Sequence, residues 1–171
     1  MRLFLIGFMG CGKTYTGSRL AKQLNYPFVD LDDYIEAQTG KSISQLFDQE
    51  GEDGFRIIEK QALREMANYD EVVVSCGGGT PCFFDNMEWM KKHGKTIFLD
   101  LPPKLLEKRL IQGLEKRPLI KDLNKKGALL SFIASKLSDR IPFYHRADII
   151  FNPDNETLPP WIALEHWILY G

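Results

Sequence analysis

A glycine-rich stretch near the N-terminus carries the clearest chemical pattern of the chain. Residues 7–14 read GFMGCGKT, which matches the phosphate-binding pattern G-x-x-x-x-G-K-[ST]. Glycines allow successive backbone N–H groups to approach a polyphosphate closely at the positive end of a helix. We expect Lys13 to reach the β- and γ-phosphates of a nucleotide, and the Thr14 hydroxyl to be a ligand of Mg²⁺. The stretch therefore predicts a site for a nucleotide phosphate.

The residues on either side supply the context that this pattern needs. Before it, residues 3–6 (LFLI) form a short apolar run, which is typical of a strand buried on both faces. After it, Leu20 and Leu24 recur at helical spacing. The alternative is a glycine-rich turn with an incidental Lys-Thr pair, and the order strand, glycine loop, helix argues against it.

Carboxylates follow a second expected strand, at residues 27–30. Asp30 and Asp32 share the same strand parity, so we expect both to point toward the phosphate loop from the carboxyl end of the sheet. A carboxylate there can hold Mg²⁺ through water or accept a proton from a hydroxyl nucleophile. The alternative is structural, with Asp32 or Asp33 capping a helix that begins near Tyr34.

Three consecutive glycines, Gly77, Gly78 and Gly79, follow a third expected strand at residues 72–75. Without side chains they allow backbone N–H groups to come close to a ligand at the same edge of the sheet as the phosphate loop. A tight turn into the next helix is the alternative. The functional interpretation is that this loop belongs to the same site.

Two groups of charged residues also have a structural and a functional interpretation. Arg56 and Glu59 are neighbours on a helix expected over residues 52–67, either as a surface ion pair or as part of a site. Residues 113–127 are polar and basic, which suits a lid that carries Arg117 over a phosphate. A solvated loop is the alternative for that segment.

The elements that must position these residues alternate between strand and helix. Short apolar runs predict five strands, at residues 3–6, 27–30, 72–75, 96–100 and 148–151. Helical patterns between them predict an α/β fold, three layers deep, with a central parallel sheet of about five strands. Right-handed crossovers then bring every strand's carboxyl end to one side of the sheet. We expect one domain over residues 1–171, with the lid at about 113–127.

Three of the expected helices have informative ends or faces. Ser42 and Gln45 form a plausible capping box before a short helix. A later amphipathic helix is expected over residues 128–137. The closing helix, residues 161–170, has four apolar side chains that are expected in the core: Trp161, Leu164, Trp167 and Ile168.

Composition excludes several classes of protein. Hydrophobic residues make up 44% and charged residues 26% of the 171 positions, so disorder is not expected. A net charge of −1 argues against a nucleic-acid partner, because there is no basic excess to displace counterions. No apolar run approaches the roughly 20 residues of a membrane span. We expect a cytoplasmic monomer with no membrane partner.

The cysteines and histidines indicate no metal cluster and no disulfide framework. Three cysteines cannot all pair within the chain, and their spacing matches no metal motif. Cys11 and Cys76 are interpreted as small packing residues in a reducing compartment, with an oxidation-sensitive thiol as the lesser alternative. The three histidines are scattered along the sequence.

Taken together, these motifs resemble the shikimate kinases, small members of the nucleoside-monophosphate-kinase-like P-loop group. The resemblance covers most of the chain, and the motifs follow one another in the same order as in the family. The resemblance rests on these motifs: GFMGCGKT at 7–14, Asp30-x-Asp32, Phe55-Arg56-x-x-Glu59, the triple glycine at 77–79, Lys116-Arg117-Pro118-Leu119 and Arg140-x-Pro142-x-Tyr144. Two departures are the cysteines at positions 11 and 76 and a longer segment over 124–139.

For the nucleotide, the resemblance implies ATP as co-substrate and Mg²⁺ as metal. Thr14 and Asp30 would hold the metal, Asp30 in its outer shell, and Ser75 would join through water. Lys13 would act on the transferring phosphate, and Arg117 would close on it from the lid. The implied ATP-binding residues are Gly10, Cys11, Gly12, Lys13, Thr14, Tyr15, Arg109 and Arg117.

For the acceptor, the resemblance implies shikimate. Asp32 would contact its hydroxyls and act as base for the attacking 3-hydroxyl. Arg56 and Arg140 would bind its carboxylate, with Glu59 orienting Arg56. The other implied contacts are backbone donors at Gly78 and Gly79 and the ring-walling Phe47 and Phe55.

The implied reaction is transfer of the ATP γ-phosphoryl group to the 3-hydroxyl of shikimate, a step of chorismate and aromatic amino acid biosynthesis. Two alternatives remain open. A gluconate kinase shares the fold and also phosphorylates a small hydroxy acid. A nucleotide-binding module without catalysis belongs to another class, and Lys13, Asp32 and Arg117 argue against it.

Overall fold

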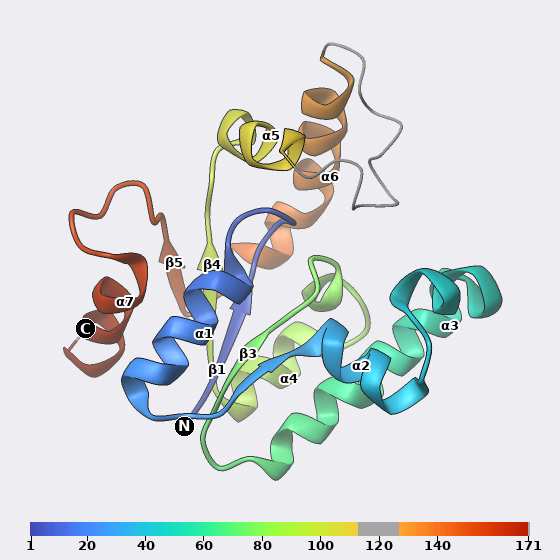
Figure 1. Ribbon diagram of the computed structural model, residues 1–171, viewed down its shortest axis with the longest axis horizontal. Helices are drawn as coiled ribbons and strands as arrows, with labels where there is room; N and C mark the ends of the chain where they lie inside the picture. The colour runs from blue at the N-terminus through green and yellow to red at the C-terminus, as the bar shows by residue number, and fades with distance from the viewer. Residues whose placement is uncertain (113–126, 171) are drawn as a thin grey trace.

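The computed structural model describes residues 1–112 and 127–170 and has a parallel sheet at its centre (Figure 1). Five strands are present in these ranges, in the spatial order β2-β3-β1-β4-β5, and every neighbouring pair is parallel. Their bounds are β1 Arg2–Ile6, β2 Phe28–Asp30, β3 Val72–Ser75, β4 Lys95–Leu99 and β5 Ile149–Phe151. The α/β prediction is confirmed, and the strands differ from the expected ranges only at their ends.

The apolar runs form strands because both faces of the sheet are covered. Residues 3–6 of the central strand β1 are 0% exposed, and the whole of β3 is buried. Burial on both faces explains why these segments are continuous apolar runs and do not alternate with polar residues. Since the strands are parallel, β1, β2 and β3 all end at the same edge, where the glycine loops begin.

Seven helices and two short 3₁₀ turns lie between the strands or after the last of them in the described ranges. The helices are α1 Lys13–Leu24, α2 Leu31–Thr39, α3 Ile43–Glu65, α4 Asn86–His93, α5 Pro103–Ile111, α6 Ala128–Tyr144 and α7 Pro160–Tyr170. The 3₁₀ turns are η1 Met66–Asn68 and η2 Thr80–Cys82. Helix α1 packs beside α7, and α5 packs against α6 (Figure 1). None of the helices in the described part of the chain is both long and apolar enough to cross a membrane.

Helix α3 joins the two helices expected here, the short one after Ser42 and the one over residues 52–67, across a single break. The Ser42 capping box forms as predicted, since the Ser42 hydroxyl accepts from the Gln45 N–H at 3.2 Å and the Gln45 side chain accepts from the Ser42 N–H at 2.8 Å. Gly51 then leaves the helical conformation, with φ at 67°. The second part of the helix, after this break, carries Arg56 and Glu59.

Two predicted helix boundaries were wrong. Helix α2 begins at Leu31, not near Tyr34, because Asp30 at the end of β2 is itself the N-cap. Helix α6 continues past residue 137 to Tyr144 and includes Pro142. A proline inside a helix removes one hydrogen bond and crowds the preceding turn. The complete burial of Tyr144 at the end of this helix offsets that cost.

The expected core of the closing helix is only partly correct. In α7, Leu164 is 0% and Ile168 is 7% exposed, as predicted, whereas Trp167 is 50% exposed and Trp161 is half-buried. The helix packs mainly against α1, and one neighbouring helix covers only part of a broad apolar face. A large indole at the edge of such an interface stays partly in solvent.

Candidate functional site

The phosphate loop lies between the end of β1 and the start of α1, and its shape requires glycine. Gly7, Gly10 and Gly12 have φ values of 141°, 81° and 98°, which other residues rarely adopt. Gly12 is the N-cap of α1 and offers no side chain to the first N–H groups of that helix. Those donors are therefore available to an anion at the positive helix end.

Lys13 and Thr14, the first two residues of α1, lie against the loop and the neighbouring strand ends. The Lys13 ammonium donates to the carbonyl oxygens of Gly7 at 2.9 Å and Phe8 at 3.1 Å, so its charge lies directly over the loop. The Thr14 hydroxyl donates to Asp30 Oδ2 at 2.8 Å and lies 3.4 Å from the Ser75 hydroxyl. Three strand ends thus converge on the start of α1.

The oxygen atoms around Thr14 fit Mg²⁺. Hydroxyl and carboxylate oxygens are the hard ligands that this ion prefers, and an ion that also binds nucleotide phosphates needs only one or two protein groups. In the described ranges no group of three or more His, Cys, Asp or Glu residues could hold a metal by itself. Thr14, with Asp30 and Ser75 behind it, is the group suited to a nucleotide-bound ion.

A hollow of about 320 Å³ adjoins the outer side of the phosphate loop. Arg109 of α5 donates to the Cys11 carbonyl at 3.3 Å and lies within 3.5 Å of Asp154. The hollow is lined by Gly10, Cys11, Gly12, Tyr15, Thr16, Arg109, Pro153 and Pro160. The structure therefore brings Tyr15 and Arg109 together with the loop, in a space beside the phosphate positions.

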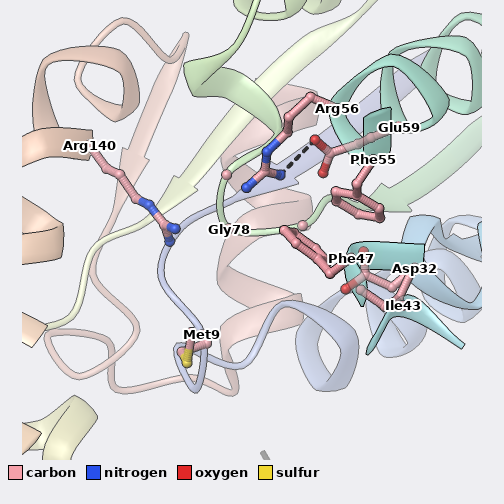
Figure 2. A pocket seen from close by; sticks show the side chains of 11 residues that line it. Met9, Asp32, Ile43, Phe47, Phe55, Arg56, Glu59, Gly78 and Arg140 are labelled. Atoms are coloured by element: carbon pink, nitrogen blue, oxygen red, sulfur yellow. Dashed lines mark hydrogen bonds and ion pairs between the residues drawn. The ribbon is translucent and has the colours of Figure 1, made fainter. Parts of the chain in front are cut away.

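A second cavity, of about 160 Å³, lies on the inner side of the loop and is shown in Figure 2. It is lined by Met9, Asp32, Ile43, Phe47, Phe55, Arg56, Glu59, Gly77, Gly78, Gly79 and Arg140. These residues come from α2, α3, α6 and the two glycine loops. The cavity contains all the residues that the sequence singled out for the acceptor.

Both arginines of this cavity pack directly on the triple glycine. A Cβ atom on Gly78 would lie 2.9 Å from Arg140 Nη1, and one on Gly79 would lie 2.6 Å from Arg56 Nη2. Neither Gly78 nor Gly79 donates its N–H to an acceptor within the described part of the chain. The loop therefore admits the two guanidinium groups and keeps backbone donors available beside them.

The pair Arg56 and Glu59 is buried, which excludes the surface ion pair that was its alternative interpretation. The two residues are 7% and 1% exposed, and Arg56 Nη1 donates to Glu59 Oε2 at 2.8 Å. Thr80, also buried, donates to the other Glu59 oxygen at 2.5 Å. The Arg56 guanidinium lies 4.1 Å above the Phe83 ring. With Glu59 on one edge and the Phe83 ring on one face, the guanidinium is held in one orientation in the cavity.

Asp32 faces this cavity from the first turn of α2. The predicted parity argument was wrong, because β2 ends at Asp30 and Asp32 is already helical. The alternative interpretation, in which Asp32 or Asp33 caps the helix, is excluded as well, since the cap is Asp30, whose Oδ1 accepts from the Asp32 N–H at 3.1 Å. Burial raises the pKa of Asp32 to about 6, and the charges of Asp30 and Glu59 add to the shift while Lys13 opposes it.

The remaining expected residues fall into three cases. Phe47 and Phe55 stack with their ring centroids 4.4 Å apart and form one wall of the cavity. Cys11 and Cys76 are each 1% exposed, and burial raises the pKa of the Cys76 thiol, which agrees with a packing role. Arg117 and the expected lid, apart from Gly127, lie outside the described residues.

Several residues at the site were not singled out from the sequence. Met9 and Ile43 line the acceptor cavity, and Thr80 supports Glu59 from behind. The hydroxyl of Tyr144 donates to the Gly78 carbonyl at 2.6 Å. Thr80 directly follows the triple glycine and Tyr144 ends the Arg-x-Pro-x-Tyr motif, so their positions gave a signal, but only their contacts reveal what they do.

The fold and the two adjoining cavities define a class of protein. A parallel α/β sheet with a phosphate loop after its central strand provides a nucleotide site. A separate cavity, with two arginines and a carboxylate of raised pKa, lies on the other side of the same loop. Together these features are those of a P-loop kinase that acts on a small anionic acceptor.

Comparison with known proteins narrows this class to one family. The family model described as "Shikimate kinase" matches residues 9–167. The shikimate kinase of Bacteroides fragilis is 47% identical over 154 residues, which cover 90% of this chain and 86% of that protein. The shikimate kinase of Nostoc punctiforme is 40% identical over 95% of this chain and 87% of that protein. The chain belongs to the shikimate kinase family.

Solved structures agree with this assignment. The crystal structure of the shikimate kinase from Bacteroides thetaiotaomicron has a TM-score of 0.91 and 42% identity, over 99% of this chain and 98% of that one. The shikimate kinase from Acinetobacter baumannii, in complex with shikimate, has a TM-score of 0.82 and 31% identity, over 98% and 90% of the two chains. The expected P-loop kinase fold is confirmed.

Proposed function

We propose that this protein transfers the γ-phosphoryl group of ATP to the 3-hydroxyl of shikimate and forms shikimate 3-phosphate for aromatic amino acid biosynthesis. Membership of the shikimate kinase family supports this reaction. The observation that carries it is the acceptor cavity, in which Arg56 and Arg140 lie on one glycine loop and Asp32 lies beside the phosphate loop. Such a cavity suits a small ring with one carboxylate and several hydroxyls.

Binding of the acceptor is assigned to three kinds of contact. Arg56 and Arg140 bind the carboxylate, since a guanidinium forms paired hydrogen bonds with it. Gly78 and Gly79 donate backbone N–H groups, which have no other acceptor in the described residues. The stacked rings of Phe47 and Phe55 pack against the apolar side of the acceptor ring. These contacts fix which hydroxyl lies next to the phosphate loop.

Asp32 is assigned as the general base. A carboxyl group with a pKa of about 6 is mostly ionised at neutral pH, and it is a stronger base than an ordinary aspartate. Ionised Asp32 accepts the proton of the attacking hydroxyl, and the hydroxyl oxygen then bonds to the γ-phosphorus as the bond to ADP breaks. Most of the rate comes from positioning and from neutralisation of charge.

The nucleotide is assigned to the phosphate loop and the adjoining hollow. Lys13 stabilises the charge on the transferring phosphate, while Tyr15 and Arg109 lie beside the outer part of the nucleotide. Thr14 and Asp30 hold Mg²⁺, which neutralises phosphate charge when it is bound. Arg117 adds positive charge from the lid over residues 113–127, and closure excludes water as a competing nucleophile.

The organisation of the molecule also belongs to this proposal. We place the chain in one domain, acting as a monomer in the cytoplasm on ATP and shikimate, without a nucleic-acid or membrane partner. The net charge of −1 supports the statement about nucleic acid, because there is no basic excess to displace counterions. Sedimentation equilibrium measures the mass directly, and a dimer at assay concentrations would contradict the monomer.

A coupled assay of ADP release tests the reaction. MgATP is supplied with shikimate, with gluconate or with no acceptor, each acceptor at saturating concentration. We expect strong turnover with shikimate alone. Turnover with gluconate only would retain the nucleotide site and reject the acceptor assignment. ATP binding without turnover on either acceptor would indicate a non-catalytic nucleotide-binding module.

A further inference from the structure

Arg56 binds a second carboxylate, that of Glu52, which the proposed reaction does not use. Glu52 lies one helical turn before Arg56 in α3, and its Oε1 accepts from Arg56 Nη2 at 3.1 Å. An ion pair at this spacing on an exposed helix face contributes little. Here one partner is different, because the Arg56 side chain is only 8% exposed while that of Glu52 is 57% exposed.

The position of Glu52 on the guanidinium decides its effect. A guanidinium binds a carboxylate through two parallel N–H groups, either Nε with Nη2 or Nη1 with Nη2, so Nη2 belongs to both pairs. Glu59 accepts from Nη1 and Glu52 accepts from Nη2, whereas the buried Nε has no partner in the described residues. An incoming carboxylate therefore meets Glu52 at the nitrogen that either arrangement needs.

Glu52 also lines a space that adjoins the acceptor cavity. This further cavity has a volume of about 290 Å³. The two cavities share Met9, Phe47, Arg56 and Arg140, and Glu52 lines the further one together with Lys136 of α6. An anion that enters is attracted by Arg140 and Lys136 and is repelled by Glu52.

We propose that Glu52 is an internal competitor for Arg56, which the carboxylate of the acceptor must displace, and that it thereby determines specificity. This inference rests on the proposed acceptor site. An anion that contacts only Arg56 binds weakly, because it merely takes the place of the Glu52 carboxylate. An acceptor that also contacts Arg140, the glycine loop and Asp32 gains enough to displace Glu52. Discrimination by a repulsive group of this kind is a general route to specificity.

The test is a calorimetric titration of Glu52→Gln with shikimate and with its methyl ester, which has no negative charge. Glutamine keeps the size of the side chain and removes the competing charge. We expect Glu52→Gln to bind shikimate about threefold to tenfold more tightly than the unaltered protein, and to bind the ester with unchanged affinity. Competition by acetate in the kinase assay should become stronger in the same variant.

Asp53→Asn is the matched control, because Asp53 is the exposed neighbour on the same helix and makes no ion pair in the described residues. It should change neither affinity. The proposal about Glu52 is overturned if Glu52→Gln binds shikimate no more tightly than the unaltered protein does. It is also overturned if the substitution increases the affinity for the ester as much as that for shikimate. If the unaltered protein phosphorylates shikimate but Glu52→Gln binds shikimate no more tightly, only the proposal about Glu52 is rejected. Failure of every variant to bind either ligand rejects the acceptor site as well.

Discussion

Asp32 shows how one side chain depends on its surroundings. Burial raises its pKa from 3.8 to about 6, with smaller contributions from Asp30 and Glu59. Because the folded protein holds this proton more tightly than the unfolded chain, the contribution of Asp32 to stability falls as pH rises from about 4 to about 6. The protein thus places an unfavourable charge at neutral pH where the proposed reaction needs a base.

The proposed role of Asp32 predicts a pH dependence. We expect kcat/KM for shikimate, at saturating MgATP, to rise with pH through an inflection near 6, because only the ionised carboxylate accepts the proton. Asp32→Asn should remove this inflection and lower kcat by about 100-fold or more. A pH–rate profile of both proteins measures the effect, and an inflection that survives the substitution would assign the base elsewhere.

Arg140 predicts a different kinetic result. Arg140→Ala removes one of the two carboxylate-binding groups, and a charge-assisted pair of hydrogen bonds contributes roughly 2–3 kcal/mol. We expect KM for shikimate to rise about 30-fold to 150-fold while KM for ATP changes little. Steady-state kinetics with each substrate varied in turn checks this. Near-normal shikimate kinetics would contradict the carboxylate assignment.

At the scale of elements, helix α6 and the triple-glycine loop form one unit. Tyr144 ends the helix and donates to the Gly78 carbonyl, while Arg140, one turn earlier, packs on the same glycine. Since a peptide unit is planar and trans, fixing the Gly78 carbonyl also fixes the opposite direction of the Gly79 N–H. The helix thus positions both an arginine and a backbone donor of the acceptor cavity.

Tyr144→Phe tests this coupling, because phenylalanine keeps the ring packed and removes only the hydroxyl. The partly buried Gly78 carbonyl then lacks its donor, so we expect the free energy of unfolding to fall by about 1–2 kcal/mol. KM for shikimate should rise and KM for ATP should stay unchanged. Denaturant unfolding and kinetics measure the two effects. Loss of stability without a change in the shikimate KM would leave Tyr144 a purely structural residue.

At the scale of the whole molecule, the strand order explains how distant segments meet. The phosphate loop follows β1, Asp30 ends β2, and Ser75 ends β3, and these three strands are neighbours in the sheet. Arg56 and Arg140 are then brought in by helices far apart along the chain. The phosphate loop lies between the two cavities proposed for the nucleotide and the acceptor, so in the proposed reaction the phosphoryl group passes across this loop.

Nucleotide binding should therefore stabilise the whole fold. A ligand at 100 times its Kd that binds only the folded protein adds about 2.7 kcal/mol to the free energy of unfolding. We expect MgATP to raise Tm by several degrees, and Lys13→Ala, which removes the charge over the loop, to lose most of that rise and most of the turnover. Thermal unfolding of both proteins, with and without MgATP, measures this rise in Tm. An equal shift in both proteins would argue against Lys13 as a phosphate ligand.

The sequence by itself determined the features that depend on local geometry. The glycines of residues 7–12 permit backbone conformations that other residues avoid, and the apolar runs are long enough only for buried strands. The parallel sheet, the phosphate loop and the Ser42 capping box were predicted for this reason. Most residues that line the acceptor cavity, though not Met9 and Ile43, were also named beforehand, through the resemblance and not through spacing alone.

Only the tertiary structure decided the features that depend on neighbours far along the chain. These include the burial of Arg56 and Glu59, the continuation of α6 through Pro142, and the exposure of Trp167. The raised pKa of Asp32 and the competition of Glu52 for Arg56 belong here too. Burial, desolvation and ion pairing depend on which atoms surround a group in space, and segments from different parts of the chain supply those atoms.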